Sequence, residues 1–138
     1  MKQLSLFSQP SLNIGKKFKE QLALSAKESG FSREELLARI NDLAERYGVR
    51  MLKGNGRKLT MATLEQRLNP EAAAYLPGIN AIVVLCAALR DMEPLNEMVA
   101  PLGGVLIEED DVKMLAWAKE YHRAKAAQKR MRKLEKEL

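Results

Sequence analysis

Few side chains in this sequence are of the types that perform covalent catalysis. The 138 residues include one histidine, His122, and one cysteine, Cys86. A catalytic nucleophile needs a base within hydrogen-bonding reach, yet His122 stands in a basic segment and Cys86 in the apolar run 82–89. We therefore interpret Cys86 as a small core residue and His122 as a polar surface residue. The sequence predicts a protein that is not an enzyme, with no catalytic residue and no cofactor.

Acidic side chains gather at two places where local helix structure accounts for them. Glu34 and Glu35 follow Ser32 in the pattern of a capping box, and Phe31 before it is placed to pack on Leu36. The run 108–111 is acidic and suits the positive end of a helix. A divalent-cation site in this run is an alternative, but nothing supplies its other ligands. One Cys and one His also fall short of a four-ligand zinc set, so no metal site is predicted.

The residue types that contact DNA gather between residues 50 and 70. Thr60 can cap a helix that Pro70 ends, because proline cannot donate to the helix and disfavours helical geometry at Asn69. Met61, Leu64 and Leu68 recur at helical spacing and are expected to face a core. The outer face of this helix, about nine residues long, is then formed by Ala62, Thr63, Gln66 and Arg67.

Polar side chains of these types hydrogen-bond to base edges and phosphates. The alternative is that this is an ordinary short surface helix, which also has an apolar inner face and a polar outer face. The predicted base contacts are Thr63, Gln66 and Arg67. The predicted phosphate contacts lie in the loop before the helix and are Arg50, Lys53, Arg57 and Lys58. Asn55-Gly56 could close a hairpin that makes this loop a wing. The glycines at 54 and 56 lack the spacing of a nucleotide-binding loop.

The net charge of +5 is distributed unevenly. Residues 16–70 hold twelve basic and seven acidic residues, 71–111 hold one and eight, and 112–138 hold nine and three. Two basic segments therefore flank an acidic one. Basic segments of this kind bind polyanions by releasing counterions from phosphates, and a solvated, patchy surface is the alternative.

Hydrophobic spacing predicts an all-α fold, a compact helical bundle containing a helix-turn-helix unit and followed by a long C-terminal helix. The predicted helices cover about 16–29, 33–47, 61–69, 79–90 and 94–102, and a last helix begins at a cap at Asp110 or Asp111. The residues expected to face inward in the second and fifth of these are Leu36, Leu37, Ile40, Leu43, Ala44 and Tyr47, and Leu95, Met98, Val99 and Leu102. The helix at 79–90 is the most apolar and is expected in the core. Residues 105–107 are read as a short extended segment or a buried turn.

Three regions follow from this pattern. The sequence predicts a flexible tail at residues 1–15, a helix-turn-helix DNA-binding domain at 16–110 and a basic helix at 111–138. The first part of that helix is expected to pack against other residues, and its basic second part is expected to project into solvent. A seam at coiled-coil-like spacing, interrupted by Gln128 and Glu135, suggests self-association. The seam comprises Trp117, Tyr121, Ala124, Met131 and Leu138, and the oligomerisation candidates are Trp117, Tyr121, Met131 and Leu138. A solvated tail or a phosphate-tracking arm is the alternative.

No apolar run approaches the roughly 18 residues of a membrane span, and the N-terminus lacks the features of a secretory signal. The sequence therefore predicts a cytoplasmic protein without a membrane contact.

The segments 60–70, 76–91 and 93–103 together resemble the DNA-binding regulators of temperate phages and prophages, in the broad Cro/CI and CII-like helix-turn-helix class. In that class the helix before a "Leu-Asn-Pro" type ending is the recognition helix, and the run ending Ala-Ala-Leu is a core helix. The resemblance implies a transcriptional regulator that binds double-stranded DNA as a homo-oligomer. This sequence departs from the pattern in its long second helix and its long basic loop, which puts the identity of the recognition helix in question.

A second resemblance concerns Gln3-Leu4-Ser5-Leu6-Phe7, which is similar to the peptide that binds the DNA polymerase sliding clamp. Such a peptide presents Leu6 and Phe7 to an apolar pocket, with Gln3 hydrogen-bonding at its edge. The clamp-binding candidates are Gln3, Leu4, Leu6 and Phe7. The alternative function is accordingly a protein–protein adaptor or accessory replication protein, and the alternative for the tail is that it folds onto the domain.

Overall fold

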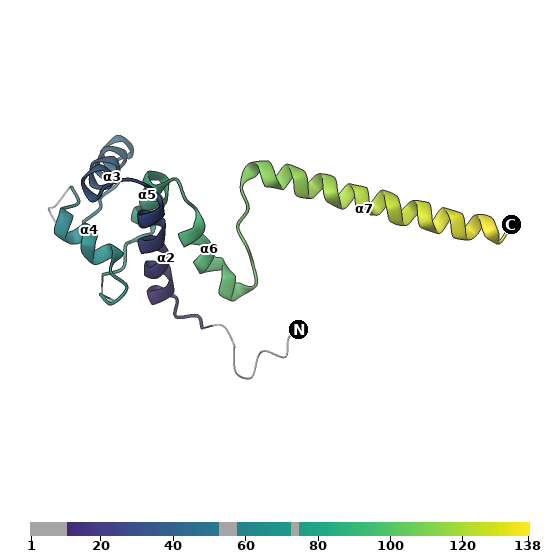
Figure 1. Cartoon of the computed structure of the whole chain (residues 1–138), viewed down its shortest axis with the longest axis horizontal. Coiled ribbons are helices and arrows are strands. Elements are labelled where there is room, and N and C mark those ends of the chain that lie inside the picture. The colour runs from purple at the N-terminus through teal and green to yellow at the C-terminus, as the bar shows by residue number, and fades with distance from the viewer. Residues whose placement is uncertain (1–10, 53–57, 73–74) are drawn as a thin grey trace. The chain divides into compact units, whose positions relative to one another are not determined.

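The computed structural model describes residues 11–52, 58–72 and 75–138 (Figure 1). Its elements, in chain order, are α2 (Gly15–Glu28), α3 (Arg33–Tyr47), α4 (Met61–Leu68), α5 (Ile79–Leu89), α6 (Glu93–Val99), a 3₁₀ turn η2 (Ala100–Leu102) and α7 (Glu109–Lys136). The described ranges contain no strand, so the predicted all-α class with a long C-terminal helix is confirmed. No helix among them is long and apolar enough to cross a membrane.

The chain divides into two compact units, Met1–Leu106 and Ile107–Leu138. The boundary predicted between residues 110 and 111 lies inside the first turn of α7. Most of the predicted N-terminal tail, residues 1–10, lies outside the described residues, and α2 already begins at Gly15.

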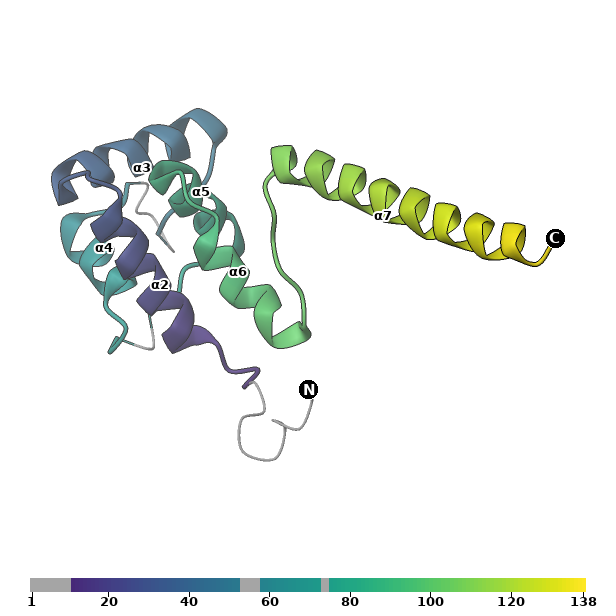
Figure 2. The same cartoon turned by 45° about the vertical axis from the view of Figure 1, so that its right-hand side comes forward.

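The first unit is a helical bundle around one apolar core. Helix α2 packs against α6 and α4, and α3 packs against α5 and α4 (Figure 2). Helices α2, α3, α4 and α5 each contribute buried residues at the 3.6-residue spacing of an inward helix face. The core includes Phe18, Leu22, Ala26, Leu36, Ile40, Ala44, Leu64, Leu68, Val84, Leu85 and Leu89, joined by Met51 and Leu59 from the segments between helices.

The start and end of α3 are set by local chemistry. The Ser32 hydroxyl accepts a hydrogen bond from the Glu35 N–H at 3.1 Å, as a capping residue should. Gly48 ends the helix in the left-handed conformation, with a φ of 66°. Phe31 packs on the core, and the Arg39 guanidinium lies 4.5 Å from its ring centre. These bounds agree with the sequence prediction.

Some residues predicted to face inward are exposed. Tyr47, in the last turn of α3, lies beyond the buried stretch that ends at Ala44. Met98 is exposed too, and Leu102 is 76% exposed because α6 tightens into the 3₁₀ turn η2. A 3₁₀ turn has three residues per turn, so it rotates the following side chains away from the α-helical face.

Helix α5 lies in the core as predicted, and its buried residues include Val84, Leu85 and Leu89. Its other side is open, since Ile79 is 82% exposed and Val83 is exposed as well. The expectation for the segment after α6 was wrong. Residues 105–107 form neither a strand nor a buried turn, and all three are exposed.

Helix α7 differs from the predicted form in its cap. Its N-cap is Glu108, without a side-chain cap hydrogen bond, whereas the predicted cap was Asp110 or Asp111. Both aspartates instead lie in the first turn, where the helix dipole favours carboxylates. Within the unit Ile107–Leu138, none of the residues of α7 is buried. That the first part of this helix packs stays a prediction.

Candidate nucleic-acid interface

Helix α4 has the bounds that its sequence predicts, within one residue. The Thr60 hydroxyl accepts a hydrogen bond from the Thr63 N–H at 3.2 Å, and the extended residue Asn69 ends the helix before Pro70. Leu64 and Leu68 are buried. The inner side of α4 is therefore committed to the core, and its other side remains available to a ligand.

The start of α4 is fastened to α3 by side-chain hydrogen bonds. The Asn41 amide donates to the Leu59 carbonyl at 3.0 Å and accepts from the Leu59 N–H at 2.7 Å. The Arg33 guanidinium pairs with the Glu65 carboxylate at 3.0 Å. Because Leu59 immediately precedes the capping residue, the two Asn41 bonds fix where α4 begins relative to α3.

The end of α4 is fastened to α2 by a buried lysine. Lys19 has 0% of its surface exposed, and its ammonium donates to the carbonyls of Gln66 and Ala72, the former at 2.8 Å. A cation there also interacts favourably with the C-terminal end of the helix dipole. Burial lowers the pKa of Lys19 below its ordinary value of 10.5, and the nearby charge of Arg67 lowers it further.

Sequence reasoning missed the role of Lys19. A signal was present, because Lys19 precedes Leu22 by three residues and so lies on the same inward face of α2. A charged residue on an inward face needs partners, and free carbonyls at a helix end supply them.

The predicted base contacts lie on the side of α4 away from the core. They differ in whether their polar groups are already hydrogen-bonded within the protein. Gln66 and Arg67 are partly exposed. Thr63 is partly exposed as well, but its hydroxyl accepts a hydrogen bond from the Thr60 hydroxyl at 2.9 Å. Thr63 is thus a partner of the helix cap, so its hydroxyl has less freedom to contact a ligand than the side chains of Gln66 and Arg67.

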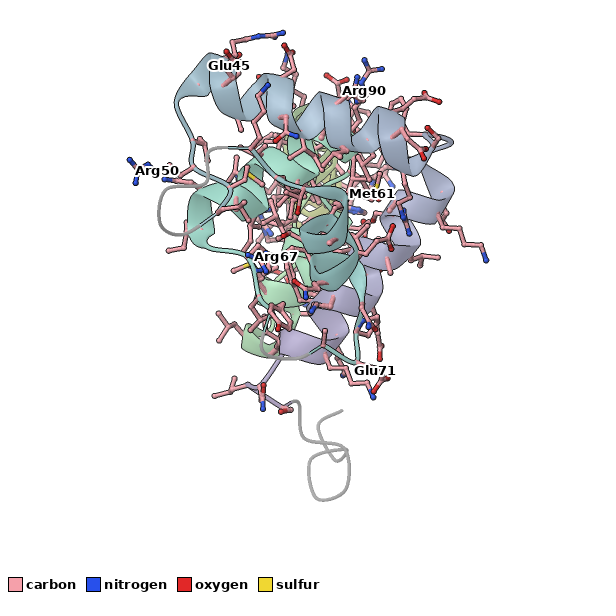
Figure 3. All side chains as sticks on the ribbon, turned by 90° about the vertical axis from the view of Figure 1, so that its left-hand side faces the viewer. Glu45, Arg50, Met61, Arg67, Glu71 and Arg90 are labelled. Carbon is pink, nitrogen blue, oxygen red and sulfur yellow. The ribbon has the colours of Figure 1, made fainter. Side chains whose placement is uncertain are left out.

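One hollow places a predicted phosphate contact next to α4. Arg67 and Arg50 line this hollow of about 420 Å³, together with Leu52, Leu76 and Ile79. Figure 3, in which α4 faces the viewer, shows Arg67 on the side of α4 turned toward Arg50. The structure therefore brings together basic residues that lie 17 positions apart in the sequence.

The second hollow, of about 460 Å³, lies beside the first. It is lined by Arg50 and Lys58, with Asn41 and Glu45 on the α3 side. Arg50 and Lys58 are both exposed. The other two predicted phosphate contacts, Lys53 and Arg57, and the proposed hairpin at Asn55-Gly56 lie outside the described residues.

The remaining chemistry-bearing residues do not form a site in the described part of the chain. Cys86 is buried as predicted, and burial together with the charge of Asp91 raises the pKa of its thiol to about 11. His122 is exposed on α7. No group of three or more His, Cys, Asp or Glu residues in the described ranges could hold a metal ion.

The other predicted binding residues lie in two places. The clamp-binding candidates Gln3, Leu4, Leu6 and Phe7 lie outside the described residues. The oligomerisation candidates Trp117, Tyr121, Met131 and Leu138 are all exposed on or at the end of α7, and the rings of Trp117 and Tyr121 stack with their centres 5.3 Å apart.

Replacing Asn41 by alanine should lower the free energy of unfolding by about 1–2 kcal/mol, because two backbone groups of Leu59 lose their partner. Chemical denaturation measures the loss. Asn80→Ala is the control, since Asn80 is exposed and lies in a helix. Equal stability of the two variants would show that Asn41 does not hold the start of α4.

Comparison of the chain with protein-family models, curated proteins and solved structures finds no match.

Proposed function

We propose that this protein binds double-stranded DNA in a sequence-specific manner through α4, as a cytoplasmic transcriptional regulator of a phage or prophage. The observation that carries the proposal is the fixing of α4 at both ends, by Asn41 at its start and Lys19 at its end. A reading helix must hold its side chains at a defined position against base edges, and a helix fixed in this way meets that requirement.

The side chains on and beside α4 suit two different roles. Arg67 and Gln66 have the donors and acceptors that pair with base edges, and Thr63 would make a smaller contribution from its capping position. Arg50 and Lys58 are exposed cations beside the helix and suit phosphate contacts. By their sequence positions, Lys53 and Arg57 are proposed to add to the same phosphate contacts.

The substitutions Arg67→Ala and Lys58→Ala should separate these roles. Loss of a bidentate base contact at Arg67 should weaken the binding free energy for the preferred DNA sequence by about 1–3 kcal/mol. It should also reduce the difference in affinity between the preferred and the scrambled duplex. Loss of a phosphate contact at Lys58 should weaken binding to every sequence and reduce the salt slope by about one. Fluorescence anisotropy with a preferred and a scrambled duplex, at several salt concentrations, measures both effects.

Loss of DNA binding by Arg67→Ala and Lys58→Ala has to be distinguished from loss of folding and from a general loss of positive charge. The charge of Arg67 lowers the pKa of buried Lys19, so Arg67→Ala relieves a repulsion and should not destabilise the fold. Lys27→Ala is the control for lost positive charge, because Lys27 is exposed on α2 and lines neither hollow. Equal losses on every sequence for Arg67→Ala and Lys58→Ala would contradict the division of roles.

The proposal itself is tested by titrating the full chain with a random duplex and with a pool enriched by selection for binding. Salt-sensitive binding with a preferred sequence is expected. Absence of binding at low salt would overturn the proposal. The adaptor alternative stays a prediction, and a pull-down of the sliding clamp with the N-terminal peptide tests it separately.

A further inference from the structure

The second half of α7 carries an uninterrupted concentration of positive charge. Between residues 121 and 134 the sequence has no acidic residue, and it has six basic ones: Arg123, Lys125, Lys129, Arg130, Arg132 and Lys133. Within the unit Ile107–Leu138 all six are exposed. The helix dipole accounts only for the cations of the last turn, Lys133 and Lys136, because its effect does not extend beyond that turn. The earlier cations need another explanation.

Five cations of α7 lie on one side of the helix. At about 100° per residue, they fall within an arc of about 100° of its circumference. We call this arc the basic face, and its members are Lys125, Lys129, Arg132, Lys133 and Lys136. Lys129 is four residues from both Lys125 and Lys133, and like charges at this spacing repel each other. An anion bound between these side chains would relieve the repulsion.

The basic face borders a hollow and has no acidic partner in its own unit. The hollow, of about 570 Å³, is lined by Ala126 and by the basic side chains at 129, 130, 132, 133 and 136. Because Ala126 is short, it leaves space among the longer side chains around it. Within this unit, which the structure describes in full, the only ion pair of α7 joins Arg123 to Glu120 at 2.6 Å, away from the basic face. The hollow is therefore surrounded by unpaired positive charge.

The density of this charge suits a nucleic acid. From Lys125 to Lys136 the helix advances by about 16 Å, so the basic face has one positive charge for roughly every 3 Å of its length. Each strand of B-DNA has one phosphate for about every 3.4 Å of the duplex axis. Lysine and arginine gathered along one helix face are the usual electrostatic sign of a nucleic-acid contact.

The opposite side of this half of α7 is apolar, with Ala127, Met131 and Leu134. A helix that lies on a membrane inserts its apolar side between the lipids. In that position the basic face would point away from the anionic headgroups, so a membrane would not engage the basic face. A DNA contact requires the basic face alone, which favours DNA over a lipid surface as its partner.

We propose that the basic face of α7 binds the phosphate backbone of double-stranded DNA, as a contact that is independent of base sequence and additional to α4. The choice of DNA as the polyanion rests on the proposed function. The contact itself requires no residue of the first unit.

Two matched double substitutions test the contact. Lys129→Gln with Arg132→Gln removes two charges from the basic face, and Lys113→Gln with Arg123→Gln removes the same two residue types from other sides of α7. Glutamine is a good helix former and all four residues are exposed, so circular dichroism should show equal helix content. Fluorescence anisotropy of the full chains with a scrambled duplex, at several salt concentrations, then measures binding.

Loss of two phosphate contacts should raise the dissociation constant of the basic-face variant for the scrambled duplex by roughly tenfold and reduce its salt slope by about two. The ratio of affinities for the preferred and the scrambled duplex should not change, because phosphate contacts carry no sequence information. The control variant should stay within about twofold of the unaltered chain, since salt screens charges that do not contact the DNA.

The outcomes separate this contact from the function proposed for α4. If the chain binds without a preferred sequence and the basic-face variant alone loses affinity, the contact is supported and sequence-specific reading by α4 is contradicted. If the chain retains a preferred sequence and the two double variants bind equally well, the contact is overturned and the function of α4 is not.

A lipid surface is tested separately, by sedimentation of the full chain with vesicles of phosphatidylserine and phosphatidylcholine. The unaltered chain and both double variants should bind these vesicles equally. Loss of vesicle binding by the basic-face variant without loss of duplex binding would assign the basic face to a membrane and overturn the proposal.

Discussion

Replacing Leu64 by alanine is expected to lower the free energy of unfolding by about 3–4 kcal/mol. The Leu64 side chain has 0% of its surface exposed and is a member of the core cluster on the inner side of α4. Truncation removes buried methyl groups and leaves a cavity, and buried Leu→Ala changes typically cost about 3–5 kcal/mol for these two reasons. Since α4 is only eight residues long, a loss on this face should also loosen the helix that we propose reads DNA.

Unfolding of this variant should be followed with a probe that lies in the first unit, because Leu64 lies there. Trp117, the one tryptophan of the sequence, lies on α7, so its fluorescence does not report directly on the core around Leu64. The thiol of Cys86 does report on this unit, because it is buried with a pKa raised to about 11, and it should react with a thiol reagent only when the unit opens. Thiol reactivity across a denaturant series therefore measures the stability of the unit.

Leu24→Ala is the matched control. Leu24 lies on α2 and is 44% exposed, so the same substitution there should cost less than about 1 kcal/mol. If the two variants lost equal stability, α4 would not be packed through Leu64 as the structure describes.

Replacing Lys19 by methionine is expected to lower the free energy of unfolding by about 2–3 kcal/mol. Methionine fills much of the space of the lysine stem but cannot donate, so the Gln66 and Ala72 carbonyls lose their charged partner. Relief of the buried charge and of its repulsion with Arg67 offsets part of this loss. Lys17→Met is the control, because Lys17 lies on the same helix and is exposed. The two variants can be compared by the Cys86 thiol assay and by DNA titration.

The pH dependence of this variant follows from the direction of the pKa shift. The pKa of Lys19 is lowered in the folded protein, so the unfolded chain holds this proton more tightly. Unfolding then takes up a proton, and the stability contributed by this group rises as the pH increases through the lowered pKa toward the ordinary 10.5. Lys19→Met lacks the group, so the stability gap between the unaltered protein and the variant should widen over that interval. A gap that narrows would contradict burial of the ammonium.

The sequence by itself determined the local elements of this protein. The bounds of α3 and α4 follow from Ser32, Gly48, Thr60 and Pro70, because capping, left-handed glycine and proline act within a few residues of chain. The inward faces of α2 and α4 follow from helical periodicity, and so do the buried positions of Leu22 and Leu64.

Only the tertiary structure decided how these elements hold one another. Lys19 meets the end of α4 across 47 residues of chain, and Asn41 meets Leu59 across 18. Such contacts depend on the arrangement of helices in space, which hydrophobic spacing does not specify. The same is true of the hollow shared by Arg50 and Arg67, and of the exposure of Tyr47, Met98 and Leu102, because burial depends on whether another element covers a face.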